Sequence, residues 1–106
     1  MNDKDIINIS QNDLLSKQEI ETEKPTLYRV ILINDDFTPM EFVVDVLMSI
    51  FHMDKHNATK TMLSVHTKGK GICGLFTYEI AETKVAQVKK MARDNQYPLL
   101  CSLEKE

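Results

Sequence analysis

The stretch LYRVILINDDFTPMEFV, residues 27–43, constrains the fold most, because it reads as a strand, a tight acidic bend and the start of a helix. Its first seven residues are mostly β-branched, aliphatic or aromatic, which favours a strand. Thr38, Pro39 and Glu41 match the N-cap, N1 and N3 positions of a capping box, so a helix is predicted to begin there. The carboxylates of Asp35 and Asp36 would then lie at the mouth of an apolar core.

The other elements follow from periodicity and from capping residues. Apolar residues at three- and four-residue spacing predict that the first helix continues to about His52. Asp54 is expected to cap a second helix over about 55–67, which Gly69 ends. We expect a second strand over 70–77, a third helix over about 78–94 that Thr77 caps, and a last strand over 98–103.

The order β-α-α-β-α-β predicts an α+β fold, a small sandwich in which three helices lie on one face of a three-stranded antiparallel sheet. A chain of 106 residues is enough for one domain with one modest core. Residues 1–25 are polar and poor in aromatic residues, so we expect a flexible amino-terminal arm and a folded core over 26–106. The third helix should turn its apolar residues inward: Ile80, Ala81, Val85, Val88 and Ala92.

Composition narrows the classes of function. The formal net charge of −3 argues against a nucleic-acid partner. No apolar stretch has the roughly 18–20 residues of a membrane span, and the amino terminus lacks the features of a signal peptide, so we expect no membrane partner and a cytoplasmic location. Cys73 and Cys101 are isolated, which favours two buried thiols but leaves a disulfide open.

The motifs NDDFTPMEFV, MLSVHTKGKGICGLF and TYEIAETKVAQV together resemble the ClpS family, the adaptors that deliver N-end-rule substrates to the bacterial ClpAP protease. The resemblance runs from about Tyr28 to Leu103, nearly the whole predicted core. It implies an adaptor, expected to be monomeric, that needs no cofactor, binds N-degron peptides and proteins, and modulates the substrate choice of ClpAP. Phe37 stands where relatives often have an aromatic hydroxyl, and we expect little consequence.

The resemblance also implies roles for individual residues. The flexible arm, residues 1–25, would reach towards the pore of the ATPase. Glu79 and Lys84 would dock on the amino-terminal domain of the ATPase ClpA. The residues that surround the amino group would be Asn34, Asp36 and His66, with Asp35 adjacent. The residues that line the pocket for the first side chain would be Ile33, Thr38, Met40, Val43, Met62, Val65 and Leu99.

The residue types suit such a ligand. An α-ammonium group offers three donors and one positive charge, so its partners must be acceptors, preferably anionic. Carboxylate, amide and imidazole groups supply them next to an apolar pocket. If Met40 closes that pocket against the Cβ of the ligand, Ile and Val would clash, whereas Leu, Phe, Tyr and Trp branch later and should fit.

Each feature also has a plainer interpretation. Paired aspartates after a strand are usually turn residues, methionines on apolar faces usually fill the core, and a histidine at a helix end often interacts with the dipole. His52 and His56 have no evident third ligand for zinc, and the lysines around the second helix fit a solvated face.

The sequence contains no believable set of catalytic residues, so we do not expect an enzyme. The competing hypothesis is a plain protein-interaction domain, like the carboxy-terminal domain of the ribosomal stalk protein. Such a domain would have no acidic pocket for a free amino terminus.

Overall fold

The computed structural model describes residues 24–106, so the predicted arm lies almost entirely outside the described residues. The α+β class and the antiparallel sheet are confirmed. In chain order the elements are β1 (Leu27–Ile33), α2 (Met40–Ser49), α3 (Lys55–Lys68), β2 (Lys70–Thr77), α4 (Tyr78–Asp94) and β3 (Leu100–Lys105). Within these residues, no helix combines the length and the apolarity needed to cross a membrane.

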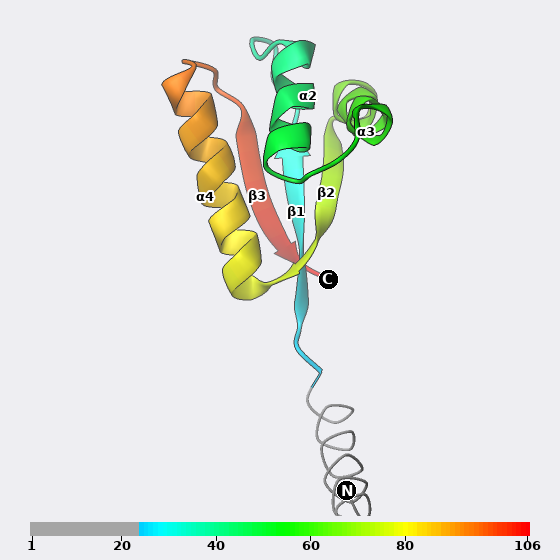
Figure 1. Cartoon of the computed structure of the whole chain (residues 1–106), viewed down its shortest axis with the longest axis vertical. Coiled ribbons are helices and arrows are strands. Elements are labelled where there is room, and N and C mark those ends of the chain that lie inside the picture. The colour runs from blue at the N-terminus through cyan, green and yellow to red at the C-terminus, as the bar shows by residue number, and fades with distance from the viewer. Residues whose placement is uncertain (1–23) are drawn as a thin grey trace, which may run out of the picture.

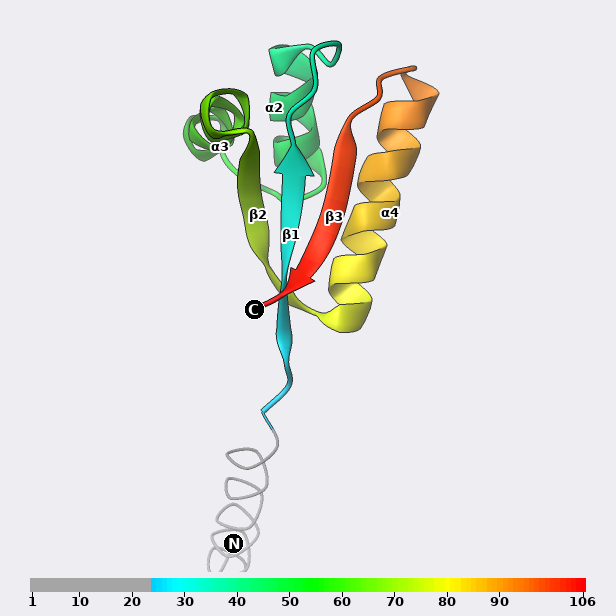
Figure 2. The ribbon, with the colours of Figure 1, turned by 180° about the vertical axis from the view of Figure 1, so that it is seen from behind.

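β1 is the central strand of the sheet, whose order is β2-β1-β3, and it pairs antiparallel with both neighbours. Figure 1 shows α2 and α4 in front of the sheet and α3 beside β2. Seen from behind in Figure 2, the opposite face of the sheet carries no helix across its middle. The layers therefore leave one broad sheet surface uncovered next to α3.

The core lies between the sheet and the two helices in front of it. Val30 and Leu32 alternate along β1 and are fully buried, as are Val46 and Leu47 of α2. The residue between Val30 and Leu32, on the other face of the sheet, is buried too, so the middle of β1 is buried on both faces. Ile80 corrects the prediction for α4, because its side chain is 50% exposed whereas the other four predicted inward residues are buried.

Backbone hydrogen bonds set the end of α2 earlier than periodicity predicts. His52 has a φ of 56°, and the N–H of Met53 donates to the carbonyl of Leu47 at 3.2 Å. This left-handed turn closes the helix at Ser49 rather than near His52. The next helix follows the prediction, since Asp54 accepts from the N–H of Asn57 and Gly69 ends it with a φ of 89°.

The capping box predicted for the first helix is wrong. The helix begins at Met40, Pro39 occupies the N-cap position, and no side chain caps it. The reason is that Thr38 bonds to Asp35 instead of to the helix. Thr77 does occupy the N-cap position of α4, but its side chain makes no capping hydrogen bond.

β3 also begins and ends two residues later than predicted. Leu99 turns into the core just before the strand, so pairing with β1 starts at Leu100 opposite Ile33. At the other end the pairing continues until Tyr28 faces Lys105. Residues 28–33 of β1 therefore all have a partner on this side.

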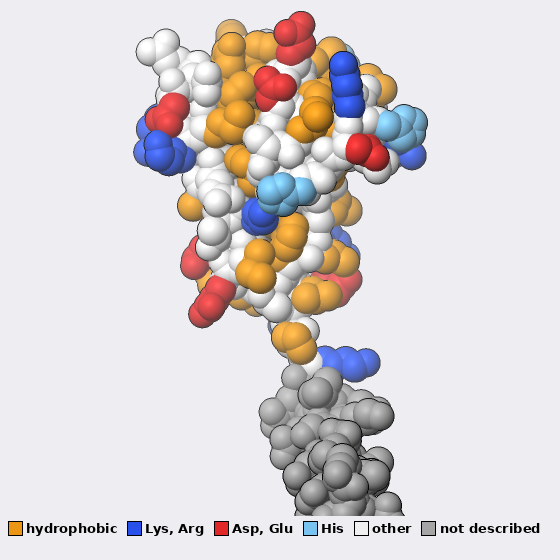
Figure 3. All heavy atoms as spheres, viewed as in Figure 1, with side chains coloured by type: hydrophobic (Ala, Val, Ile, Leu, Met, Phe, Trp, Pro, Cys, Tyr) orange, Lys and Arg blue, Asp and Glu red, His pale blue; other side chains and the backbone are white. Residues whose placement is uncertain are grey.

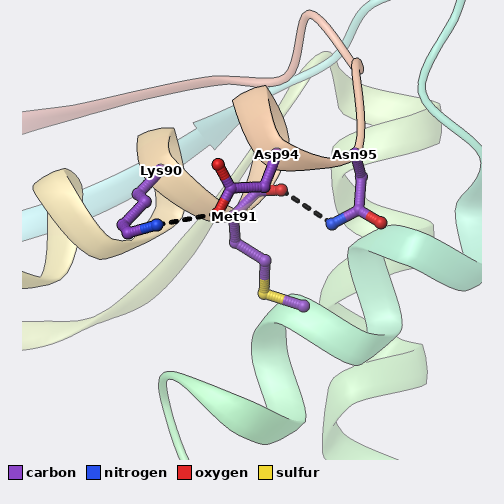
Figure 4. A network of polar contacts seen from close by, with 4 residues as sticks. All are labelled: Lys90, Met91, Asp94 and Asn95. Carbon is purple, nitrogen blue, oxygen red and sulfur yellow. Dashed lines mark hydrogen bonds and ion pairs between the residues drawn. The ribbon is translucent and has the colours of Figure 1, made fainter.

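The carboxyl end of α4 is joined to α2 (Figure 4). Lys90 and Asp94 form an ion pair at 2.8 Å on the exposed side, which contributes little stability. The side-chain amide of Asn95 donates to the carbonyl of Met91 at 2.8 Å. The sulfur of Met91 lies 3.7 Å from the hydroxyl of Ser49, so this methionine packs the two helices together.

Cys73 and Cys101 are buried free thiols on β2 and β3, with β1 between them. Burial raises the pKa of Cys101 to about 12. Burial, with a smaller contribution from Cys101, raises the pKa of Cys73 even further. Both thiols therefore stay protonated at neutral pH, and the prediction of two buried thiols is confirmed.

We expect both cysteines to resist a thiol reagent in the folded protein, because only an accessible thiolate reacts readily. Dithionitrobenzoate at pH 8 should label the native chain at least about a hundredfold more slowly than the urea-unfolded chain, since labelling must wait for opening of the core. Absorbance at the wavelength of the released thiolate measures both rates. Rapid labelling of the native chain would contradict the burial of these residues.

Candidate functional site

A hollow of about 360 Å³ lies at the end of β1, between the loop 34–39, the first turns of α2 and one side of α3. In Figure 3, hydrophobic and acidic side chains lie next to one another at the end of the molecule where α2 begins. The loop supplies mostly polar groups and the helices mostly apolar ones. The lining residues are Asn34, Asp35, Asp36, Phe37, Thr38, Pro39, Met40, Val43, Met62, Val65 and His66.

Asp35 holds the loop in shape. One of its carboxylate oxygens accepts the backbone N–H groups of Phe37 and Thr38, both at 2.8 Å. Its other oxygen accepts the hydroxyl of Thr38 at 2.7 Å. These hydrogen bonds hold a sharp turn in the chain immediately before α2 begins.

The same contacts set the ionisation of Asp35. Burial alone would raise its pKa, but the Thr38 hydroxyl and the two backbone N–H groups favour the charged form, and the pKa is lowered. Asp36 differs from its neighbour, because its side chain is exposed and accepts no hydrogen bond from residues 24–106. The two carboxylates therefore differ, because Asp35 bonds to its own loop whereas Asp36 is exposed at the edge of the hollow.

α3 supplies His66 and part of the apolar wall. A methyl group on Gly71 of β2 would lie 2.7 Å from Cγ2 of Val65, so α3 packs directly on the backbone of β2. The backbone N–H of Asn34 donates to the carbonyl of Gly69 at 2.9 Å, which ties the end of α3 to the loop. These two contacts bring His66 and Asn34 to the same hollow, although they are far apart in the sequence.

The apolar wall has a buried part and an exposed rim. Val43 and Val65 are buried, and Met62 is half-buried. Met40 is 43% exposed, so its long side chain stands at the opening. Methionine is unbranched and adapts its shape to a neighbour, which suits a gate over a ligand side chain.

The structure gathers most of the residues that the sequence indicated. All four predicted polar residues line the hollow, as do five of the seven predicted pocket residues. Ile33 and Leu99 do not line it; Leu99 is buried in the core. Phe37 and Pro39 line it without having been predicted, although they belong to the same NDDFTPM run. Phe37 is 79% exposed, which is unusual for a phenylalanine and marks the rim.

Glu79 and Lys84 are both on α4, and neither residue lines the hollow. Glu79 is exposed in the first turn of the helix. The ammonium group of Lys84 donates to the carbonyl of Ile50 at 2.7 Å and lies 5.9 Å from the centre of the Phe51 ring. Lys84 therefore satisfies a carbonyl at the end of α2.

The hollow suits a cation attached to an apolar group. Its polar end offers a carboxylate, an amide and an imidazole as acceptors, and aliphatic side chains form the adjoining wall. Within the described part of the chain, no group of three His, Cys, Asp or Glu side chains could hold a metal ion.

Known proteins resemble this chain along most of its length. The family model for the ATP-dependent Clp protease adaptor protein ClpS matches residues 23–102. The Clp protease adapter ClpS of Escherichia coli O127:H6 is 55% identical over 101 residues, which is 89% of this chain and 95% of that protein. The ClpS of Hyphomonas neptunium is 56% identical over 94 residues, 89% of this chain and 80% of that protein.

A solved structure agrees with these relatives. Agrobacterium tumefaciens ClpS2 bound to L-phenylalaninamide has a TM-score of 0.76 and 35% sequence identity, and the match covers 78% of this chain and all of that one. The matching family consists of protease adaptors, not enzymes. This chain belongs to the ClpS family of ATP-dependent Clp protease adaptor proteins.

Proposed function

We propose that this adaptor recognises proteins by a free α-amino group and a bulky hydrophobic first residue, Leu, Phe, Tyr or Trp, and delivers them to the ClpA ATPase of ClpAP. The observation that carries the proposal is the hollow, where acceptors and aliphatic side chains meet within one cavity. The relative from A. tumefaciens supports it, since the L-phenylalaninamide bound there has both a free amino group and a benzyl side chain.

The amino group would bind at the polar end. Asn34, Asp36 and His66 offer an acceptor each, and hydrogen bonds to a charged group contribute about 1.5–3 kcal/mol. Asp35 adds negative charge but has its oxygens occupied by the loop. Acetylation removes the charge and two donors from the ligand, so it should exclude such a peptide.

The first side chain would enter the apolar part. A hollow of about 360 Å³ has room for one large side chain, and burying a Leu or Phe side chain contributes about 1.5–3 kcal/mol. After the entropic cost of association is subtracted, we expect a free energy of binding of about −8 kcal/mol. This corresponds to a Kd in the low micromolar range or below.

Delivery requires a second surface. The family works with the Clp protease, and we propose that Glu79 and Lys84 of α4 contact the amino-terminal domain of ClpA. These residues lie apart from the hollow, which leaves it accessible to substrate while the adaptor is docked. Through the same contact the adaptor would change which substrates ClpAP degrades.

Lys84 should also affect stability, because its ammonium group caps α2. Replacing it by methionine leaves the carbonyl of Ile50 without its donor, and we expect the free energy of unfolding to fall by about 1 kcal/mol. Glu79→Gln should stay within about 0.5 kcal/mol of the parent, as exposed substitutions usually do. Urea unfolding measures both. An unchanged Lys84→Met would show that the contact with Ile50 is not formed in solution.

The proposed site can be mapped by NMR with L-phenylalaninamide as ligand. We expect the largest amide shift changes at residues 34–38, at Met40 and at residues 62–66, and none at Glu79 or Lys84. N-acetyl-L-phenylalaninamide, which has the same side chain but no charge, is the matched control and should leave the spectrum unchanged. Equal responses to the two compounds, or shift changes centred on another surface, would refute the site.

A further inference from the structure

A second cavity, of about 760 Å³, lies between α3 and the uncovered face of the sheet. We propose that it binds an acidic, extended polypeptide segment of a partner protein, in which aliphatic residues alternate with the acidic ones. We call it the basic groove. Its lining residues are Arg29, Ile31, Lys60, Thr61, Ser64, Lys68, Lys70, Gly71, Ile72 and Glu104.

The walls of the basic groove carry a local excess of positive charge. Lys60 and Lys68 come from α3, and Arg29 and Lys70 from the sheet, whereas Glu104 is the single acidic lining residue. None of the four cations forms an ion pair with any residue between 24 and 106. This excess occurs in a chain whose net charge is −3, so it is a local feature that would attract an anionic segment.

The floor of the basic groove is apolar. Ile31 of β1 and Ile72 of β2 are partners in the sheet register, on the face that no helix crosses in Figure 2. Ile72 is 56% exposed, whereas Ile31 is only 3% exposed. An extended segment with acidic side chains toward the lysines could bury its alternate aliphatic side chains on Ile72.

These features favour a peptide over a nucleic acid. Base stacking needs aromatic or arginine side chains, and the groove has no aromatic lining residue and one arginine. The half-buried hydroxyl of Ser64 can bond to a peptide backbone, whereas the hydroxyl of Thr61 donates to the sulfur of Met53 at 3.7 Å. The lysines and apolar floor match the two kinds of side chain in an acidic, aliphatic segment.

The groove is separate from the hollow, because the two lie on different sides of α3. Lys60, Ser64 and Lys68 follow one another at four-residue intervals and share one side of the helix. Met62 and His66 face the hollow instead. A partner in the groove can therefore be bound together with a substrate in the hollow, and the inference does not depend on the proposed function.

The test uses the full chain and a short fluorescein-labelled peptide that alternates Glu and Leu and is acetylated at its amino terminus. Acetylation removes the charged amino group for which the hollow is the proposed site, so binding by this peptide reports on the groove. By fluorescence anisotropy at low salt, we expect it to bind at least about tenfold more tightly than the same peptide with Gln in place of Glu. Lys60→Glu/Lys68→Glu should weaken its binding at least about tenfold.

The matched control is Lys89→Glu/Lys90→Glu on α4, which makes the same change in net charge away from the groove. It should keep the parent affinity, and both variants should still bind L-phenylalaninamide as the parent does. Equal losses in the two variants would mean non-specific attraction and would overturn the inference, as would the absence of binding by the parent.

A third variant tests whether the acidic residues of this chain itself occupy the groove. Glu19, Glu21 and Glu23 precede β1, and their replacement by Gln in the full chain removes three negative charges. An unchanged affinity for the Glu–Leu peptide supports an external partner. An affinity about tenfold higher in this variant would identify residues 19–23 as the occupant and overturn the assignment to a partner protein.

Discussion

Replacing Met40 by alanine is expected to let peptides that begin with isoleucine or valine bind with nearly the affinity of those that begin with leucine. Met40 lines the hollow and is 43% exposed, and we propose that its side chain lies against the first carbons of the ligand side chain. Ile and Val branch at Cβ, where the methionine would crowd them, whereas Leu branches one carbon later.

The expected effect is large because overpacking costs about 1–3 kcal/mol, which corresponds to up to roughly a hundredfold discrimination. Fluorescence anisotropy with Leu-, Ile- and Val-initiated peptides of otherwise identical sequence measures it. Met48→Ala is the matched control, since Met48 is similarly exposed on the same helix but does not line the hollow. If Met40→Ala still rejected Ile and Val as strongly as the parent does, another residue would have to be the gate.

Replacing Asp36 by alanine is expected to weaken peptide binding, whereas replacing Asp35 by alanine is expected to destabilise the fold. Asp36→Ala should weaken peptide binding by about tenfold to a hundredfold, the value of one charge-assisted hydrogen bond, and leave stability within about 0.5 kcal/mol. Asp35→Ala removes the acceptor of two backbone N–H groups and of the Thr38 hydroxyl. We expect it to lower the free energy of unfolding by about 1–2 kcal/mol, as the loss of a helix cap does.

The contribution of Asp35 should depend on pH. Its pKa in the folded protein is lowered, so the stabilisation is complete above the ordinary carboxyl range, near pH 4, and is lost as the pH falls through the folded pKa. The stability difference between the parent and Asp35→Ala, measured by urea unfolding, should therefore be full at pH 7 and shrink as the pH is lowered below about 4. A difference that did not change with pH would show that the charged carboxylate is not what holds the loop.

Local patterns predicted the elements well where each signal has one interpretation. β1, β2 and α4 have the predicted bounds, because β-branched runs and amphipathic periodicity begin and end sharply there. The predicted capping box failed because Asp35 competes for Thr38 three residues away, and the sequence does not show which hydrogen bond is made. The helix therefore starts at Met40, and the carboxylate of Asp35 accepts the hydrogen bonds within the acidic bend.

The candidate site was predictable for a different reason. Its polar residues are concentrated in one run, NDDFTPM, and the resemblance to ClpS joined His66 and Met62 to it. Phe37 was missed as a lining residue because a side chain at a loop tip has no periodicity. The basic groove could not be predicted from the sequence either. Lys60, Lys68 and Lys70 line one cavity only because α3 packs beside the sheet, and the sequence pattern does not show that packing.

We propose that the hollow binds a free amino terminus together with a large side chain. The most direct measurement is fluorescence anisotropy with one labelled decapeptide whose first residue is Leu, Ile, Met or acetylated Leu. We predict that the peptide with a free amino-terminal Leu binds tightly and that the other three bind weakly. Equal binding of all four, or of none, would contradict the account and leave a protease adaptor whose recognition surface lies elsewhere.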